Sequence, residues 1–92
     1  MLYEKILIVG QTKDGKKFRP SDWAERLYYT VASYGKNGRV IFNPLVKLNQ
    51  EDNSKSFVID VELQNKDPMI YDFLIDFAIS NELETRDQNR NL

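Results

Sequence analysis

Carboxylates, lysines and arginines are the groups in this chain that could do chemistry, because the sequence has no histidine and no cysteine. This excludes Ser-His-Asp and Cys-His nucleophiles, and zinc sites that need imidazole or thiolate ligands. Two acid pairs remain: Asp72 with Asp76, one helical turn apart, and Asp60 with Glu62 on one face of a predicted strand. Both pairs fall on faces that the hydrophobic pattern predicts to be exposed. We therefore expect no catalytic residue and no enzyme.

The segment Gly10 to Lys16 imitates a phosphate-binding loop, since it follows an apolar run and has the spacing G-x-x-x-x-G-K. The position that should bring a hydroxyl to Mg²⁺ is Lys17, and the next helix begins only after Pro20. The Asp14-Gly15 dipeptide instead predicts a hairpin turn. Residues 51–55 lack the glycine and terminal glutamate of a calcium loop. We expect no cofactor and no metal.

A block from Phe18 to Leu27 gathers charged groups where a helix should start. Its candidate ligand-binding residues are Arg19, Ser21, Asp22, Trp23 and Arg26. The guanidinium groups and the backbone N–H groups of a helix start could bind an anion or a carboxylate metabolite. A structural interpretation also accounts for the block: Ser21 caps the helix, Trp23 anchors it, and Asp22 pairs with Arg26 one turn later. Both interpretations remain open.

The residues Lys13, Lys16, Lys17 and Arg19 form a basic cluster on the predicted hairpin, and Tyr29 could add a stacking surface. The whole chain is nearly neutral, with 13 basic and 14 acidic residues. No global field therefore attracts it to phosphate backbones, and lysine also protects the edges of sheets. We expect no nucleic-acid partner, and keep weak binding through Lys13 to Arg19 as an alternative.

Hydrophobic periodicity predicts the elements that position these groups. Strands are expected at Lys5–Val9, Lys17–Arg19, Arg39–Asn43 with a continuation at Leu45–Leu48, and Ser56–Leu63. In the last of these, Phe57, Ile59, Val61 and Leu63 alternate with more polar residues. A first helix should run from about Ser21 to a stop at Gly35, with Trp23, Leu27, Val31 and Tyr34 on its buried face and Tyr29 exposed.

A second helix should start at Asp67-Pro68 and end near Asn81, a residue suited to a left-handed stop. Its expected buried half consists of Met69, Ile70, Phe73, Leu74, Phe77 and Ala78. Apolar residues continue on the other side at Tyr71, Ile75 and Ile79, which makes the apolar arc about twice as wide as a surface helix needs. That extra face could pack against the first helix or form an interface with a second copy of the chain.

These elements indicate an α+β fold of the split β-α-β, ferredoxin-like-related type, a two-layer sandwich in which about four antiparallel strands carry two helices on one face. The expected single domain spans residues 1–83. Residues 84–92 are almost wholly polar and predict a disordered tail. The apolar run near the N-terminus is too short for a signal peptide or a membrane span, and with the missing cysteines it predicts a cytoplasmic protein without membrane contact.

The sequence resembles a proteobacterial family known as domain of unknown function 3579. The resemblance rests on Asp14-Gly15, on the block Phe-Arg-Pro-Ser-Asp-Trp-Ala-Glu-Arg-Leu at Phe18 to Leu27, and on the helix that Asp67-Pro68 begins. It implies a bacterial cytoplasmic protein and supplies no catalytic residues.

Three functional hypotheses follow. The first is a non-enzymatic interaction or regulatory module that binds a protein partner or dimerises through Tyr71, Ile75 and Ile79. The second is a sensor of a small anion or metabolite at Arg19 and Arg26. The third is weak nucleic-acid binding through the lysine hairpin.

Overall fold

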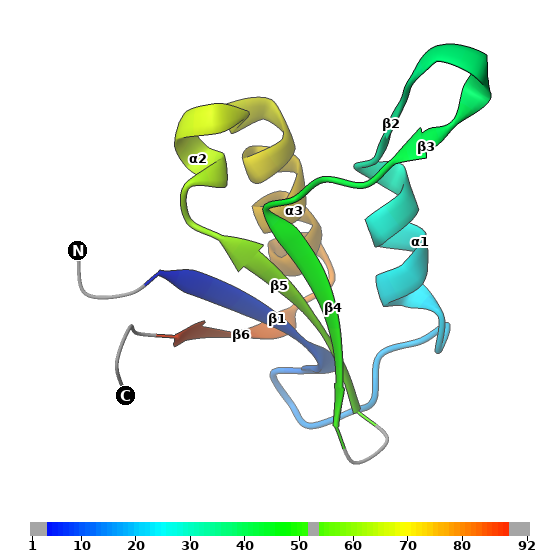
Figure 1. Ribbon diagram of the computed structural model, residues 1–92. Coiled ribbons are helices and arrows are strands. Elements are labelled where there is room, and N and C mark those ends of the chain that lie inside the picture. Colours follow the sequence, from blue (N-terminus) through cyan, green and yellow to red (C-terminus); the bar gives the residue numbers. More distant parts are fainter. Residues whose placement is uncertain (1–3, 52–53, 89–92) are drawn as a thin grey trace.

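Four antiparallel strands form the main sheet of this computed structural model, which describes residues 4–51 and 54–88 (Figure 1). The strands are β1 (Lys5–Thr12), β4 (Val46–Glu51), β5 (Ser54–Asp60) and β6 (Leu83–Gln88). They lie in the order β4-β5-β1-β6, so β1 and β5 are central. Helix α1 (Trp23–Thr30) lies in the path from β1 to β4, and α3 (Pro68–Ser80) joins β5 to β6. Two β-α-β units therefore interlock, which confirms the predicted two-layer α+β fold.

The core lies between one face of this sheet and the two helices. Ile8 pairs with Phe57 and Ile6 with Ile59 across β1 and β5, and all four side chains are buried. The predicted alternation in β5 is confirmed at Phe57 and Ile59. The strand ends at Asp60, however, because the chain turns there into α2 (Leu63–Lys66). Leu63 is buried as predicted, although it lies in a helix.

A small hairpin interrupts the frame between α1 and β4, where the sequence predicted a longer helix. It consists of β2 (Ser33–Tyr34), the short 3₁₀ helix η1 (Lys36–Gly38) and β3 (Val40–Ile41), and it projects from the body of the domain (Figure 1). Helix α1 ends at Thr30, and Tyr34, expected on its buried face, is 69% exposed. The predicted stop at Gly35 is therefore wrong. Asn37 and Gly38 have φ of 68° and 70°, as an Asn-Gly hairpin turn requires.

The third β-strand expected, at Arg39–Asn43, is reduced to β3 and pairs with β2. The sheet strand is β4, which begins after Pro44 and pairs with β5 along its length. Proline cannot donate a hydrogen bond to a ladder, so the sheet strand starts beyond it.

The predicted disordered tail from residue 84 is wrong for residues 84–88, which belong to β6. This strand pairs with the edge of β1, for example Ile8 with Thr85 and Ile6 with Asp87. Backbone hydrogen bonds to β1 hold β6 in the sheet. They do not require alternating hydrophobic residues, so this edge strand has no such pattern in the sequence; Leu83 is buried at its start. The domain thus extends past residue 83. Residues 89–92 of the predicted tail lie outside the described residues.

Two turns complete the positioning of the elements. Gly15 has φ of 88° and its N–H donates to the Thr12 carbonyl at 2.9 Å, which confirms the hairpin turn at Asp14-Gly15. Its return strand at Lys17–Arg19 is limited to a bridge between Gln11 and Lys17. Asp67 caps α3 as predicted, accepting a hydrogen bond from the Ile70 N–H at 3.3 Å. At the other end, Glu82 adopts the left-handed conformation expected for Asn81.

Within residues 4–51 and 54–88, no helix has the length and apolar character needed to cross a membrane.

Candidate functional site

Trp23 is the structural anchor of the Phe18 to Leu27 block. Its side chain is 4% exposed and lies between Phe18, whose ring centroid is 5.7 Å away edge-on, and Phe77, stacked at 6.3 Å. Gly10 makes room for the indole, since a Cβ at that position would lie 3.0 Å from Trp23 Nε1 and 2.8 Å from the Lys55 carbonyl oxygen. Trp23 therefore joins β1, α1 and α3 and has a structural role.

Three of the four charged residues of the block, Asp22, Glu25 and Arg26, form ion pairs at the surface. Arg26 Nε donates to Asp22 Oδ2 at 2.9 Å, the pair predicted from their spacing, and this hydrogen bond lowers the pKa of Asp22 below its usual value. Asp22, rather than the predicted Ser21, occupies the N-cap position of α1, without a side-chain cap bond. Arg19 and Ser21 are exposed. This geometry favours the structural interpretation of the block, and anion binding there stays a prediction.

An ion pair that the sequence did not indicate ties β5 to the start of α1. Lys55 Nζ donates to Glu25 Oε2 at 2.8 Å and to the Ser21 carbonyl oxygen at 2.9 Å. The hydrogen bond from Lys55 is the main reason that the pKa of Glu25 lies below its ordinary value. Glu25 Oε1 is buried and has no hydrogen-bond partner in the described part of the chain. Because thirty residues separate the two partners, no local pattern could have revealed the pair.

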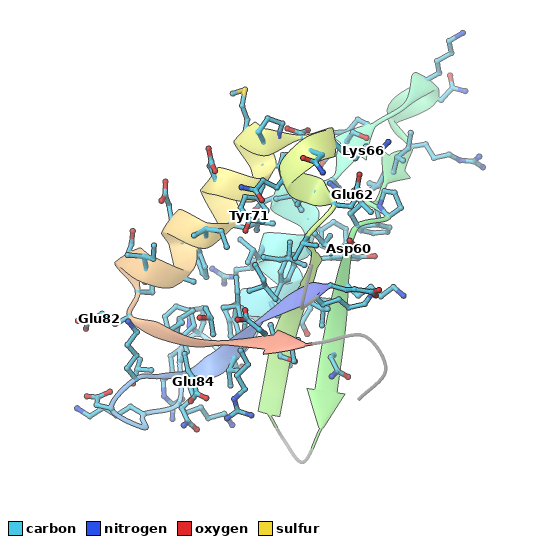
Figure 2. The ribbon with its side chains drawn as sticks, turned by 90° about the vertical axis from the view of Figure 1, so that its left-hand side faces the viewer. Asp60, Glu62, Lys66, Tyr71, Glu82 and Glu84 are labelled. Atoms are coloured by element: carbon cyan, nitrogen blue, oxygen red, sulfur yellow. The ribbon has the colours of Figure 1, made fainter. Side chains whose placement is uncertain are left out.

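Helix α3 is rotated relative to the sequence prediction. Leu74 and Ala78 are buried as expected, but Phe73 and Met69 are 45% and 83% exposed, so their predicted burial is wrong. Tyr71 and Ile75, two of the three predicted interface residues, pack partly buried against the core. Figure 2 shows Tyr71 on the side of α3 toward the rest of the domain. Ile79, the third, is 67% exposed.

The rotation follows from which strands lie beneath each helix. Helix α3 packs closely against β6 and α2, whereas α1 packs closely against β4 and β5. The strand beside α3 is β6, which contains residues that the sequence predicted to be a disordered tail. The residues on the β6 side of the helix, such as Tyr71 and Ile75, are therefore partly covered. The opposite side of α3 faces α1 across a gap that only side chains bridge.

That gap is a hollow of about 260 Å³, here named the α1–α3 groove. All of its lining residues except Thr30 come from two segments that carry the family resemblance: Phe18, Pro20, Trp23, Arg26, Leu27, Thr30, Phe73 and Phe77. Aromatic and aliphatic carbons dominate the walls, and Arg26 is the one charged lining residue. Such a groove can hold an apolar side chain of a partner, with a polar contact at one end.

The remaining candidate residues do not form sites in the described structure. Asp72 and Asp76 are exposed, as predicted, and Asp60 Oδ1 accepts from the Glu62 N–H in a turn. The lysines of the hairpin are exposed, while Tyr29 packs edge-on against Phe42 at 5.2 Å. Across residues 4–51 and 54–88, no group of three acidic side chains is arranged to hold a metal ion.

Comparison with known proteins places the whole fold in one family. A solved structure, described as the solution structure of the first structural representative of its family, is 31% identical in sequence, covers 96% of this chain and 84% of its own, and has a TM-score of 0.85. No curated protein matches. The sequence profile of the family described as "Protein of unknown function (DUF3579)" matches residues 2–88, from before β1 to the end of β6. The chain therefore belongs to this family, as its Phe18 to Leu27 block and Asp67-Pro68 helix had indicated.

Proposed function

We propose that this domain is a non-enzymatic protein-interaction module that forms a homodimer through the α1–α3 groove. The observation that carries the proposal is the apolar groove itself, with Phe73 exposed on its α3 wall and Met69 exposed one turn earlier on the same helix. Large apolar side chains grouped beside a hollow are typical of protein interfaces, where an aromatic anchor of one partner fills a pocket of the other.

Charge complementarity favours a second copy of the chain as the occupant. Asp72 and Asp76 lie on the exposed surface of α3, Asp76 about one turn after Phe73, and the helix contains no lysine or arginine. Arg26 lies on the opposite wall of the groove. In a two-fold dimer each contact occurs twice, so the Arg26 of each copy would meet the acidic surface of the other. A net charge of −1 adds little repulsion between copies.

The chemistry of the titratable groups supports a non-enzymatic role. The two carboxylates with lowered pKa are held in ion pairs, Asp22 with Arg26 at the start of α1 and Glu25 with Lys55 of β5. A bacterial cytoplasmic location is part of the proposal, supported by the family resemblance and by the lack of cysteine.

Sedimentation velocity from micromolar to millimolar protein tests the proposal. We expect a reversible monomer–dimer equilibrium that Phe73→Asp weakens by about 30-fold or more, the effect of losing an interface anchor worth about 2 kcal/mol. Ile79→Asp is the matched control, because Ile79 is exposed on the opposite side of the same helix, and it should leave the equilibrium unchanged.

Two results would contradict the proposal. One is a wild-type chain that remains monomeric up to millimolar concentration. The other is a dimer that Ile79→Asp disrupts as strongly as Phe73→Asp, because the interface would then not be the groove.

A further inference from the structure

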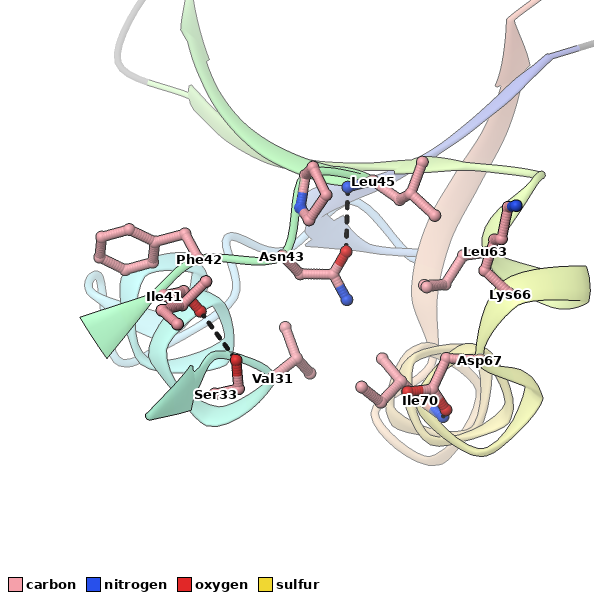
Figure 3. A pocket seen from close by; sticks show the side chains of 11 residues that line it. Val31, Ser33, Ile41, Phe42, Asn43, Leu45, Leu63, Lys66, Asp67 and Ile70 are labelled. Atoms are coloured by element: carbon pink, nitrogen blue, oxygen red, sulfur yellow. Dashed lines mark hydrogen bonds between the residues drawn. The ribbon is translucent and has the colours of Figure 1, made fainter. Parts of the chain in front are cut away.

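A second hollow, larger than the α1–α3 groove, lies between the end of the β2–β3 hairpin and the short helix α2 (Figure 3). It has a volume of about 450 Å³ and lies between the segment that follows β3 and the helices α2 and α3. Its apolar walls include Val31, Leu45, Leu63 and Ile70. We name it the Asn43 cavity. Its volume is in the range of small-molecule sites, which are about 300–1,000 Å³.

The side chain of Asn43 has a fixed orientation at this cavity. Its Oδ1 accepts a hydrogen bond from the Leu45 N–H at 2.9 Å, so the oxygen and nitrogen of the amide cannot be interchanged. The amide nitrogen Nδ2 consequently points into the cavity (Figure 3). Within the described residues, Nδ2 has no hydrogen-bond partner. The cavity thus presents a hydrogen-bond donor that is free to bind an acceptor on a ligand.

The other polar side chains of the lining are either hydrogen-bonded within the protein or paired with a neighbouring opposite charge. Ser33 Oγ donates to the Ile41 carbonyl oxygen at 3.5 Å, and Asp67 Oδ1 accepts from the Ile70 N–H at the start of α3. Lys66 and Asp67 are adjacent on one wall, and their opposite charges offset each other. An apolar cavity with one oriented donor and no net charge suits a neutral ligand.

We propose that the Asn43 cavity binds a small neutral apolar molecule that carries a carbonyl oxygen. The carbonyl accepts a hydrogen bond from Asn43 Nδ2, and the carbon skeleton packs against Val31, Leu45 and Ile70. This site is separate from the α1–α3 groove, with which it shares no lining residue. Ligand binding therefore does not depend on dimerisation, and either proposal can fail without the other.

Titration of the ¹⁵N-labelled protein with three probes of nearly equal shape tests the proposal by NMR. The probes are 4-phenyl-2-butanone, which has the carbonyl, 3-phenylpropanoate, which has a carboxylate instead, and 4-phenylbutan-2-amine, which has an ammonium group instead. We expect the ketone to shift the Asn43 side-chain NH₂ signals and the Leu45 amide in a saturable manner. The carboxylate should bind more weakly because moving its charge from water into an apolar cavity costs free energy that the neutral ketone does not incur, and the ammonium group should not bind because it has no acceptor atom.

Asn43→Asp tests the role of the donor. The carboxylate of the variant can still accept from the Leu45 N–H, but it replaces the amide donor with an oxygen, so ketone binding should weaken by about tenfold or more. Asn49→Asp makes the same chemical change at an exposed position of β4 that does not line the cavity, and it should bind the ketone like the wild type.

Ser33→Trp, at an exposed lining residue, should obstruct the cavity and abolish ketone binding even if Asn43→Asp disturbs the local fold. The proposal is overturned if the ketone causes no saturable shift at Asn43 and Leu45, if the amine binds as well as the ketone, or if folded Asn43→Asp retains wild-type affinity. Shifts confined to the α1–α3 groove would overturn it as well.

Discussion

The two flanks of α3 carry similar apolar residues but differ in how far these residues are buried. On the β6 flank, Tyr71 and Ile75 are partly buried against the core, while on the α1 flank Phe73 remains exposed at a groove. Helix propensity and hydrophobic pattern do not distinguish the two flanks. The neighbouring element does, because a strand pairs into the sheet on one side and a second helix stays at a distance on the other.

The comparison shows how a domain of this size acquires an interaction surface. The two helices pack closely against different strands, α1 on β4 and β5 and α3 on β6. Between the helices, contact is made by the aromatic side chains Phe18, Trp23 and Phe77 rather than by close backbone packing. The consequence is an apolar groove, with the partly buried Phe77 at its floor and the exposed Phe73 at its rim.

Leu83→Ala should have the largest effect on stability, because it removes a buried side chain from the β6 flank of α3. Leu83 is fully buried where β6 begins, and truncation of such a leucine costs about 2–5 kcal/mol of unfolding free energy. Urea denaturation followed by circular dichroism measures the loss. Thr85→Ala, at an exposed position of the same strand, should change the stability by less than about 0.5 kcal/mol. Equal effects of the two substitutions would mean that β6 does not close this flank.

Phe77→Ala should have the next largest effect, since Phe77 is partly buried and stacks on Trp23. Losing this ring should cost about 2 kcal/mol, less than the 3–5 kcal/mol of a fully buried phenylalanine. Trp23 is the only tryptophan, so its fluorescence emission should also shift to longer wavelength as water reaches it. Phe73→Ala, one turn earlier at the open rim, should cost less than about 1 kcal/mol and leave the emission unchanged. If Phe73→Ala lost more unfolding free energy than Phe77→Ala, then Phe73 and not Phe77 would form the buried floor of the groove.

The Glu25–Lys55 pair should give a small, pH-dependent effect on the attachment of α1 to the sheet. The pKa of Glu25 in the folded protein lies below its ordinary value of 4.5, so the pair stabilises the fold above that pH and the stabilisation is lost as the pH falls through the lowered pKa. The partly exposed pair is worth about 0.2–1 kcal/mol. In urea titrations from neutral to acidic pH, wild type should lose its advantage over Glu25→Gln on acidification. A difference between the two proteins that does not change with pH would refute this role of the carboxylate.

The sequence predicted the parts of the fold that local chemistry determines. The alternation at Phe57 and Ile59, the turn at Asp14-Gly15 and the cap at Asp67-Pro68 are each encoded within a few residues, and all three are confirmed. The β2–β3 hairpin was missed, although its Asn37-Gly38 turn has a local signal that could have revealed it.

Other features depend on long-range contacts and have no local signal. Strand β6 is held by the free edge of β1, and the rotation of α3 follows from the position of β6. Of the candidate site, the sequence identified the Phe18 to Leu27 block and the apolar excess of the second helix. Which flank of that helix stays open could be decided only once β6 was placed.

The most direct test of the open flank uses the absence of cysteine from the chain. Single-cysteine variants Met69→Cys and Ile79→Cys place a thiol at two exposed positions of α3, the first one turn before the groove residue Phe73 and the second outside the groove lining. The rate of reaction with a maleimide reagent is then measured at micromolar and at millimolar protein. We predict that both thiols react freely in dilute solution, and that concentration slows the reaction at position 69 but not at position 79. Equal rates at both positions under both conditions, or protection at position 79 alone, would contradict the α1–α3 groove as the docking surface.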